Sequence, residues 1–128
     1  MPMRADFLGC PIDILTIDET IAHAVHAMRD KTRRQHVALN VAKFVNMRRD
    51  PVLRQDVTSS DIVGIDGMGI VLAARLLGLR VKQRVAGIDL FMELMDTCAK
   101  QKFRPFLLGA KPEILQKAAA VLKSKFPG

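Results

Sequence analysis

Short apolar runs alternate along this chain with longer stretches in which apolar residues recur every three or four positions. Three runs have the continuous apolar character of parallel strands covered on both faces: Val37–Leu39, Ile62–Ile65 and Pro105–Leu108. Helical spacing covers six other stretches: 17–28, 41–49, 52–57, 70–77, 88–100 and 112–122. The alternation predicts an α/β fold of Rossmann-like type, a layered structure with a largely parallel sheet flanked by helices.

Local signals support these elements. Thr16 and Glu19 have the spacing of a capping box at the start of the first helix, and Pro112 suits the first turn of the last one. Phe7–Leu15 is apolar with turn-forming residues, which indicates a short strand or the start of a hairpin. The chain contains no repeat, low-complexity segment or linker. It is therefore expected to form a single α/β domain over 1–128.

The stretch Ser60–Gly69 carries the most chemical information. Its apolar run ends in Asp66, Gly67 and Gly69, and a helical pattern follows. In open α/β sheets, ligands bind at the carboxyl ends of strands. Glycine lets a ligand approach the backbone closely, and amides at a helix start attract anions. Asp66 is thus the candidate catalytic group, although a lone Gly-x-Gly is a weak motif and Asp66 could simply cap its helix.

Two other predicted strands end in Asn40 and Gly109, which parallel pairing would place on the same sheet edge as Asp66. Asn40 can donate and accept hydrogen bonds to a sugar or base, but it is equally suited to capping the helix that follows. Arg84 precedes another helix, where a guanidinium could hold a diphosphate. Taken alone, Arg84 is more simply a surface arginine.

Composition narrows the choice of partners. The net charge of +7, spread along the chain, suits phosphates, nucleic acid or an anionic membrane face. Nucleic acid is disfavoured because the chain has no Trp or Tyr on which bases could stack. Cys10 and Cys98 lie far apart and match no metal spacing, so neither a metal site nor a cofactor is expected. No apolar stretch is long enough to span a bilayer.

Five short motifs occur here in the order and spacing of one family. They are Leu8-Gly9-x-Pro11-Ile12-Asp13, Asn40, Asp66-Gly67-x-Gly69, Arg84-Val85-x-Gly87-x-Asp89-Leu90 and Leu107-Leu108-Gly109. The chain resembles the WecG/TagA/CpsF family, the N-acetylmannosaminyltransferase-type bacterial glycosyltransferases of glycosyltransferase family 26. The resemblance covers nearly all 128 residues.

The resemblance implies an enzyme that moves a sugar from a UDP donor to an undecaprenyl-diphosphate-linked sugar, in teichoic acid or other cell-surface polysaccharide synthesis. It implies that Asp66 is the catalytic base. Substrate-binding roles then fall to Asn40, Gly67, Gly69, Arg84 and Gly109. Two positions depart from the family pattern: Ala38 stands where Thr is common, and Gln83 where Glu is common. Ala38 lacks a hydroxyl that could touch substrate.

The family domain is about twice as long as this chain, so the chain resembles its N-terminal half. The isolated chain is expected to be inactive and to associate with further copies through an open sheet edge. The resemblance also implies a cytoplasmic protein held at the inner face of the cell membrane, where its charge suits anionic lipid. The alternatives are a non-catalytic nucleotide- or phosphate-binding Rossmann-like module and, less favoured, a nucleic-acid binder.

Overall fold

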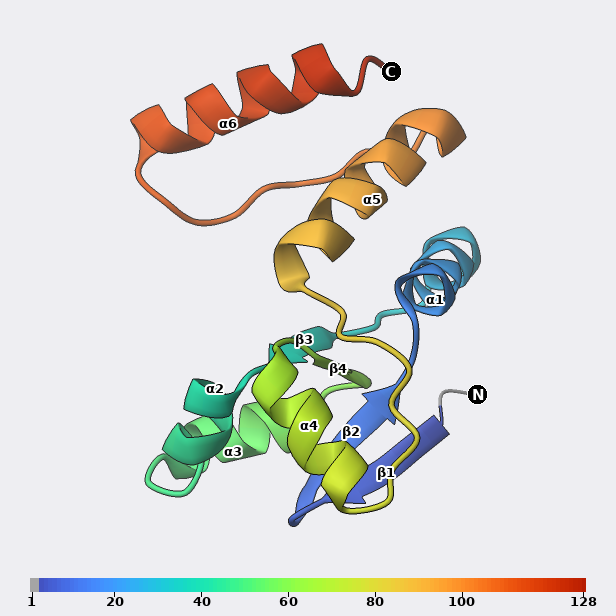
Figure 1. The fold of residues 1–128 in the computed structure, drawn as a ribbon. Helices are drawn as coiled ribbons and strands as arrows, with labels where there is room; N and C mark the ends of the chain where they lie inside the picture. Colours follow the sequence, from blue (N-terminus) through green and yellow to red (C-terminus); the bar gives the residue numbers. More distant parts are fainter. Residues whose placement is uncertain (1–2) are drawn as a thin grey trace. The chain divides into compact units, whose positions relative to one another are not determined.

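The computed structural model describes residues 3–128, in two compact units that meet at Gly87. The first unit contains four strands: β1 (Met3–Phe7), β2 (Cys10–Ile14), β3 (His36–Leu39) and β4 (Ile62–Ile65). β1 and β2 form an antiparallel hairpin, whereas β3 and β4 form a parallel pair (Figure 1). The hairpin was one of the two possibilities that the sequence left open for 7–15.

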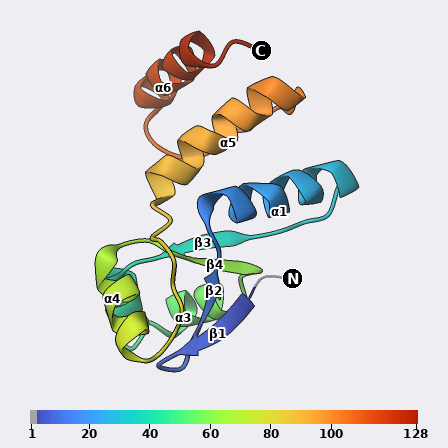
Figure 2. The same ribbon diagram turned by 45° about the vertical axis from the view of Figure 1, so that its right-hand side comes forward.

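Four helices complete the first unit: α1 (Ile17–Asp30), α2 (Val41–Asn46), α3 (Pro51–Thr58) and α4 (Met68–Leu76). α1 and α3 lie on opposite sides of the β3–β4 pair (Figure 2). The predicted cap at Thr16 forms, because the Glu19 amide donates to Thr16 Oγ1 at 3.2 Å. The Glu19 carboxylate accepts from the Thr16 hydroxyl at 3.1 Å. Asp50 caps α3 by accepting from the Leu53 amide at 3.0 Å.

The core of the first unit lies between the strands and the helices that follow them. It contains Phe7 and Ile12 from the hairpin, Leu39 and Val63 from the parallel pair, and Val71 from α4, all almost fully buried. Burying side chains of this size contributes roughly 1.5–3 kcal/mol each. Leu39 and Val63 lie in the apolar runs Val37–Leu39 and Ile62–Ile65 that the sequence shows.

An ion pair between an exposed arginine and a buried carboxylate fastens the hairpin to the parallel strands. The Asp13 carboxylate, whose side chain is fully buried, accepts hydrogen bonds from Arg4 Nε at 3.0 Å and Nη2 at 2.8 Å. It also accepts from the Val63 amide of β4 at 2.6 Å. Arg4 Nη2 donates further to the carbonyls of Ser60 and Asp61. The Asp13 carboxylate thus accepts a hydrogen bond from a β4 amide that a neighbouring strand would otherwise accept.

The second unit consists of α5 (Gly87–Gln101), which begins at the boundary residue, and α6 (Pro112–Lys125), joined by residues 102–111. The strand predicted at Pro105–Leu108 is wrong, because this segment pairs with no strand in the part of the chain that the structure describes. A strand needs a partner for its amides and carbonyls. Phe106 and Leu108 are instead 86% and 92% exposed.

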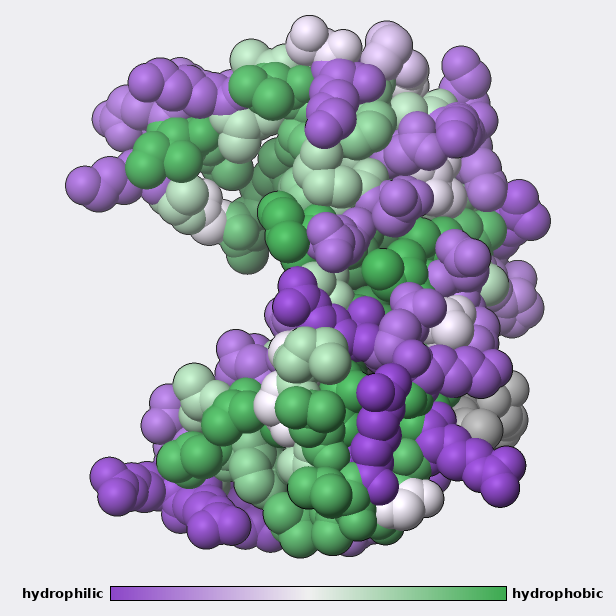
Figure 3. All heavy atoms as spheres, in the orientation of Figure 1, coloured by the Kyte–Doolittle hydropathy of each residue, from purple (hydrophilic) through white to green (hydrophobic). Residues whose placement is uncertain are grey.

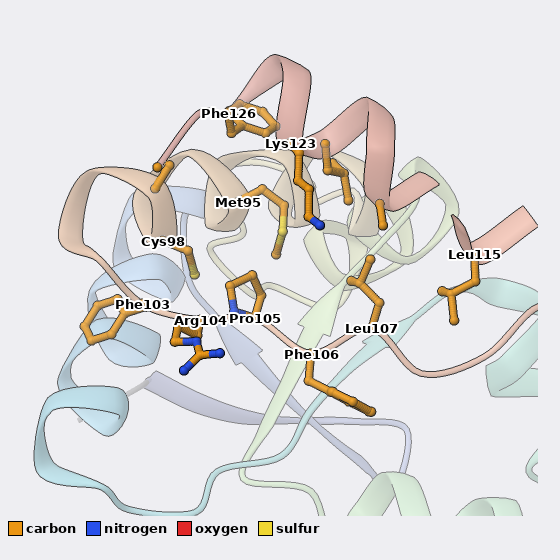
Figure 4. Close-up of a pocket in the computed structure, with 14 residues that line it drawn as sticks. Met95, Cys98, Phe103, Arg104, Pro105, Phe106, Leu107, Leu115, Lys123 and Phe126 are labelled. Atoms are coloured by element: carbon orange, nitrogen blue, oxygen red, sulfur yellow. The ribbon is translucent and has the colours of Figure 1, made fainter. Parts of the chain in front are cut away.

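An apolar pocket of about 470 Å³ opens within the second unit, between its two helices and the connection. Met95 and Cys98 of α5 line it together with Pro105 and Leu107 of the connection, and Phe106 points away from the helices (Figure 4). Burial raises the pKa of the Cys98 thiol above its ordinary value.

The α/β prediction is confirmed as a mixture of helices and strands that includes one parallel pair. The Rossmann-like layered sheet remains a prediction, because β3 and β4 are the only parallel strands among residues 3–128. None of the helices in that range is both long and apolar enough to cross a bilayer.

Candidate functional site

The parallel pairing of β3 and β4 brings Asn40 and Asp66 to one edge. Leu39 and Ile65 are aligned in register, so the residues that follow them are neighbours. The Asp66 amide donates to the Leu39 carbonyl at 2.9 Å. A Cβ placed on Gly67 would lie 4.0 Å from Asn40 Cβ. The juxtaposition of Asn40, Asp66 and Gly67 expected from the sequence is therefore present.

The Asp66 carboxylate does not cap α4. The N-cap of that helix is Gly67, which has no side chain to accept a hydrogen bond. Asp66 Oδ2 instead accepts from the Gly87 amide at 3.2 Å, so it caps the start of α5. A carboxylate accepts up to about four hydrogen bonds. Asp66 thus has acceptor capacity left for a ligand, and its side chain is only partly buried.

The segment that contains Arg84 runs beside the end of β4. The Val85 amide donates to the Ile65 carbonyl at 2.7 Å, which holds residues 84–87 next to Asp66. Arg84 itself is exposed, and no carboxylate in residues 3–128 forms an ion pair with it. Its neighbour Gln83 accepts through Oε1 from the Ile17 amide at 3.5 Å, a structural contact at the start of α1.

The two glycines after Asp66 meet different physical demands. Gly67 has φ 116° and ψ 142°, a conformation that residues with a Cβ rarely adopt. Gly69 has ordinary dihedrals, but a Cβ there would come 2.5 Å from Val41 Cγ2. Gly69 therefore allows α4 to pack closely against α2. Close packing against α2 is thus a reason for glycine at position 69 that could not be predicted from the sequence.

Asn40 has the capping role that the sequence left open. Its Oδ1 accepts from the Lys43 amide at 2.8 Å, which leaves the side-chain NH₂ group free to donate to a ligand. Gly109 belongs to the second unit, at φ 123°, and is not among the residues whose contacts build the Asp66 cluster. Its substrate-binding role stays a prediction.

Sequence reasoning overlooked a cation at this edge. Lys43 Nζ donates to the Ala38 carbonyl at 2.8 Å, on the strand that leads to Asn40. A Cβ on Gly87 would lie 3.8 Å from Ala38 Cβ and 3.4 Å from Asp66 Oδ2, so Ala38 is close to the carboxylate. The sequence signal that could have identified Lys43 as a site residue is its position in the first turn of a helix that follows a strand.

His36 marks the other end of the same strand pair. Its imidazole lies over Gly64, where a Cβ would come 2.6 Å from Nε2. His36 is an exposed residue at the start of β3, but partial burial of its ring against the sheet lowers its pKa below the ordinary value of 6.5. The Asp13 charge opposes this change, and Lys43 reinforces it. The glycine in the middle of β4 is thus explained by a side chain packed over the sheet.

The chemical groups at this edge are a carboxylate, an amide and nearby cations. A carboxylate can take a proton from a hydroxyl, and an amide can orient a sugar. Guanidinium and ammonium groups can offset phosphate charge. Within residues 3–128, no three His, Cys, Asp or Glu side chains are grouped as metal ligands would be.

Comparison with known proteins finds a matching family and similar enzymes. A family model described as the glycosyl transferase WecG/TagA/CpsF family matches residues 5–128. An N-acetylglucosaminyldiphosphoundecaprenol N-acetyl-beta-D-mannosaminyltransferase of Bacillus subtilis strain 168 is 37% identical over 70 residues, which is 55% of this chain and 27% of that protein. The enzyme of the same name from Bacillus spizizenii strain W23 is 35% identical over 83 residues, or 65% of this chain and 31% of the relative.

The aligned segment thus spans less than a third of the length of either relative. The family match, by contrast, extends over almost all of this chain and includes Asn40, Asp66 and Arg84. On that match, the chain belongs to the WecG/TagA/CpsF family of glycosyl transferases.

Proposed function

We propose that this chain carries the Asp66 site of a glycosyltransferase that uses a UDP-sugar donor and a lipid-diphosphate-linked acceptor. The observation that supports this most directly is the position of Asp66, beside Asn40 and next to the Arg84 segment. The two relatives are named for transfer of N-acetylmannosamine to an N-acetylglucosaminyl diphosphoundecaprenol. An N-acetylmannosamine-type sugar is accordingly the proposed cargo, and a cell-surface polysaccharide or teichoic acid the proposed product.

In the proposed reaction, the acceptor hydroxyl oxygen forms a bond to the anomeric carbon of the donor as the bond from that carbon to UDP breaks. Asp66 takes the hydroxyl proton, a contribution that is typically about 10²–10⁴-fold in rate. Arg84 offsets the charge that develops on UDP, a role that bidentate hydrogen bonding suits. Asn40 orients a sugar hydroxyl through its free NH₂ group.

The acceptor sets the place of the reaction. A substrate that ends in an undecaprenyl chain stays in the bilayer, so the enzyme must work at a membrane face. UDP-sugars are cytoplasmic metabolites, which places that face on the inner side of the cell membrane. The net charge of +7 favours contact with anionic lipid.

Calorimetry with UDP tests the donor site in the 128-residue chain. Arg84→Ala is expected to weaken UDP binding by roughly 1.5–3 kcal/mol, the usual contribution of a charged hydrogen bond. Arg80→Ala, an exposed arginine of the same connection, is the matched control and should leave UDP affinity nearly unchanged. Equal binding of UDP by wild type and Arg84→Ala would contradict the assignment, as would equally tight binding of sulfate.

A sugar-transfer assay on an enzyme that contains this chain and spans the length of its relatives tests Asp66. Asp66→Asn keeps an oxygen that can accept from the Gly87 amide, so the fold and UDP affinity should persist while transfer falls at least about 10²-fold. The 128 residues alone are expected to transfer no sugar. Wild-type turnover by Asp66→Asn would reduce the residue to a helix cap.

The bond from Asp66 to Gly87 also favours a second candidate. A carboxylate that holds the start of α5 has a structural role without any catalysis, as in a non-catalytic nucleotide-binding module. Such a module would bind UDP and lose that affinity in Arg84→Ala. Its full-length product would transfer no sugar.

A further inference from the structure

The surface of α2 and α4 carries a stripe of large apolar side chains that lie open to solvent. The stripe consists of Val41 and Val45 on α2 and of Met68, Leu72 and Leu76 on α4, all roughly half exposed or more, with Leu76 at 89%. Both sets are spaced by four residues, so each occupies one face of its helix. Figure 3 shows these hydrophobic residues gathered over α2 and α4, with hydrophilic residues along the margins.

The two helices present the stripe as one surface. A Cβ on Gly69 would lie 2.5 Å from Val41 Cγ2, so the starts of α2 and α4 are packed in direct contact. The inward face of α4 is anchored by Ile70, Val71 and Ala74, which are buried. Leu72 and Leu76 are therefore not needed for the core of this unit. Their exposure to water is unfavourable, and contact with another surface would remove it.

The charged residues along α2, α4 and the connection after α4 are all cationic, and acids border these segments at Asp66, before α4, and Asp50, after α2. Residues 67–88 contain no Asp or Glu but four cations: Arg75, Arg80, Lys82 and Arg84. Residues 41–49 likewise contain no acid, and α2 is followed by the exposed pair Arg48 and Arg49. The next acid, Asp50, uses its side chain to cap α3. On α6 an acid, Glu113, stands beside the exposed Ile114, whereas the exposed Val121 has only lysines as charged neighbours.

Apolar side chains on one face, flanked by Lys and Arg and free of carboxylates, are the pattern of helices that lie in a membrane interface. The leucines would enter the acyl boundary while Arg80 and Lys82 meet lipid phosphates, each adding attraction near an anionic surface. Arg84 is assigned to the donor diphosphate instead, and Arg75 donates to the carbonyls of Val81 and Lys82. A protein partner would need an acidic surface placed to match this margin, whereas an anionic bilayer supplies that charge in its lipid headgroups. The one-signed margin therefore favours lipid over protein.

We propose that the α2–α4 stripe is the surface with which this protein rests on an anionic phospholipid bilayer. The inference rests on the proposed function, because an enzyme with a lipid-linked acceptor has to bind at a membrane. Asp66 and Gly67 immediately precede α4, and Met68 begins both the helix and the stripe. One helix thus joins the proposed membrane surface to the candidate base.

Flotation of the 128-residue chain with vesicles tests the proposal. Vesicles of phosphatidylcholine alone are compared with vesicles that also contain phosphatidylglycerol. Wild type should bind the anionic vesicles, and the double variant Leu72→Gln, Leu76→Gln should bind roughly tenfold or more weakly. Val121→Gln, an equally apolar and exposed position on α6, is the control and should bind as wild type does.

The charged margin is tested separately. Arg80→Ser with Lys82→Ser should lower affinity for anionic vesicles by roughly fivefold per charge removed, because each cation near the surface adds about 1 kcal/mol. Lys111→Ser with Lys117→Ser removes the same charge from the second unit and should have a clearly smaller effect. High salt should weaken wild-type binding.

Sedimentation and UDP calorimetry on the same variants separate the outcomes. Unchanged vesicle binding by the leucine variant would overturn the proposal. So would a loss of self-association in that variant with vesicle binding intact, because the stripe would then join two copies. A wild type that binds vesicles through the stripe but does not bind UDP would refute the proposed function and leave the membrane surface standing. A wild type that binds UDP but not vesicles would overturn the membrane surface and leave the proposed function standing.

Discussion

The two units of this chain have similar sequence patterns but very different interiors. Residues up to Gly87 enclose a connected apolar core that includes members from every strand pair. In residues 88–128 only Leu90 and Cys98 are buried, and no residue of α6 is. Both α5 and α6 nonetheless have an apolar face. Helical periodicity in the sequence therefore indicates which face of a helix is apolar. That face becomes buried only where another element packs against it.

The largest expected contrast lies in core truncation. Leu39→Ala removes a fully buried side chain of β3 and should lower the free energy of unfolding by about 2–5 kcal/mol. Leu122→Ala, on the open pocket of the second unit, should cost less than about 1 kcal/mol, since water already reaches that side chain. Urea unfolding followed by circular dichroism measures both. Equal losses would mean that the second unit is packed as tightly as the first.

Ion pairs should show the same asymmetry at a smaller scale. Arg4→Met leaves the buried Asp13 carboxylate without its counterion, which is expected to cost about 3 kcal/mol. Lys100→Met breaks the exposed pair with Asp96 in α5, where the loss should be below about 1 kcal/mol. The same unfolding assay applies. A stability of Arg4→Met near wild type would show that Asp13 is held by the Val63 amide alone.

The smallest effect concerns pH, and it distinguishes the units because all three histidines are in the first one. The pKa of His36 is lowered by burial, so on acidification the unfolded chain takes up this proton before the folded one does. The free energy of unfolding should therefore decrease slightly as pH falls below about 6.5. His36→Gln should flatten that slope between pH 7 and 5.5. An unchanged slope would assign the pH dependence to other groups.

Much of the first unit could be predicted from the sequence because its signals are local. The apolar runs at Val37–Leu39 and Ile62–Ile65 gave two strands, and the polar residues after them gave the pair Asn40 and Asp66. The helix cap by Thr16 depends only on neighbours and was likewise confirmed. These features need no knowledge of distant contacts.

The errors and omissions arise from tertiary contacts. Pro105–Leu108 has the composition of a buried strand, but no described strand lies beside it to complete a ladder. The bond from Gly87 to Asp66 joins residues 21 positions apart, and the contact of Lys43 with Ala38 depends on where a helix turns after its strand. Asp13 was noticed only as part of a motif, since its function requires Arg4 and β4 to converge.

Gly69 has a mechanical consequence for the site. Because the backbone of α4 at this residue meets a methyl group of Val41, the glycine determines how near the two helix starts can come. Those starts carry Asn40 and Gly67. A larger residue at position 69 would have to displace the Val41 methyl group, directly beside the helix start that Asn40 caps.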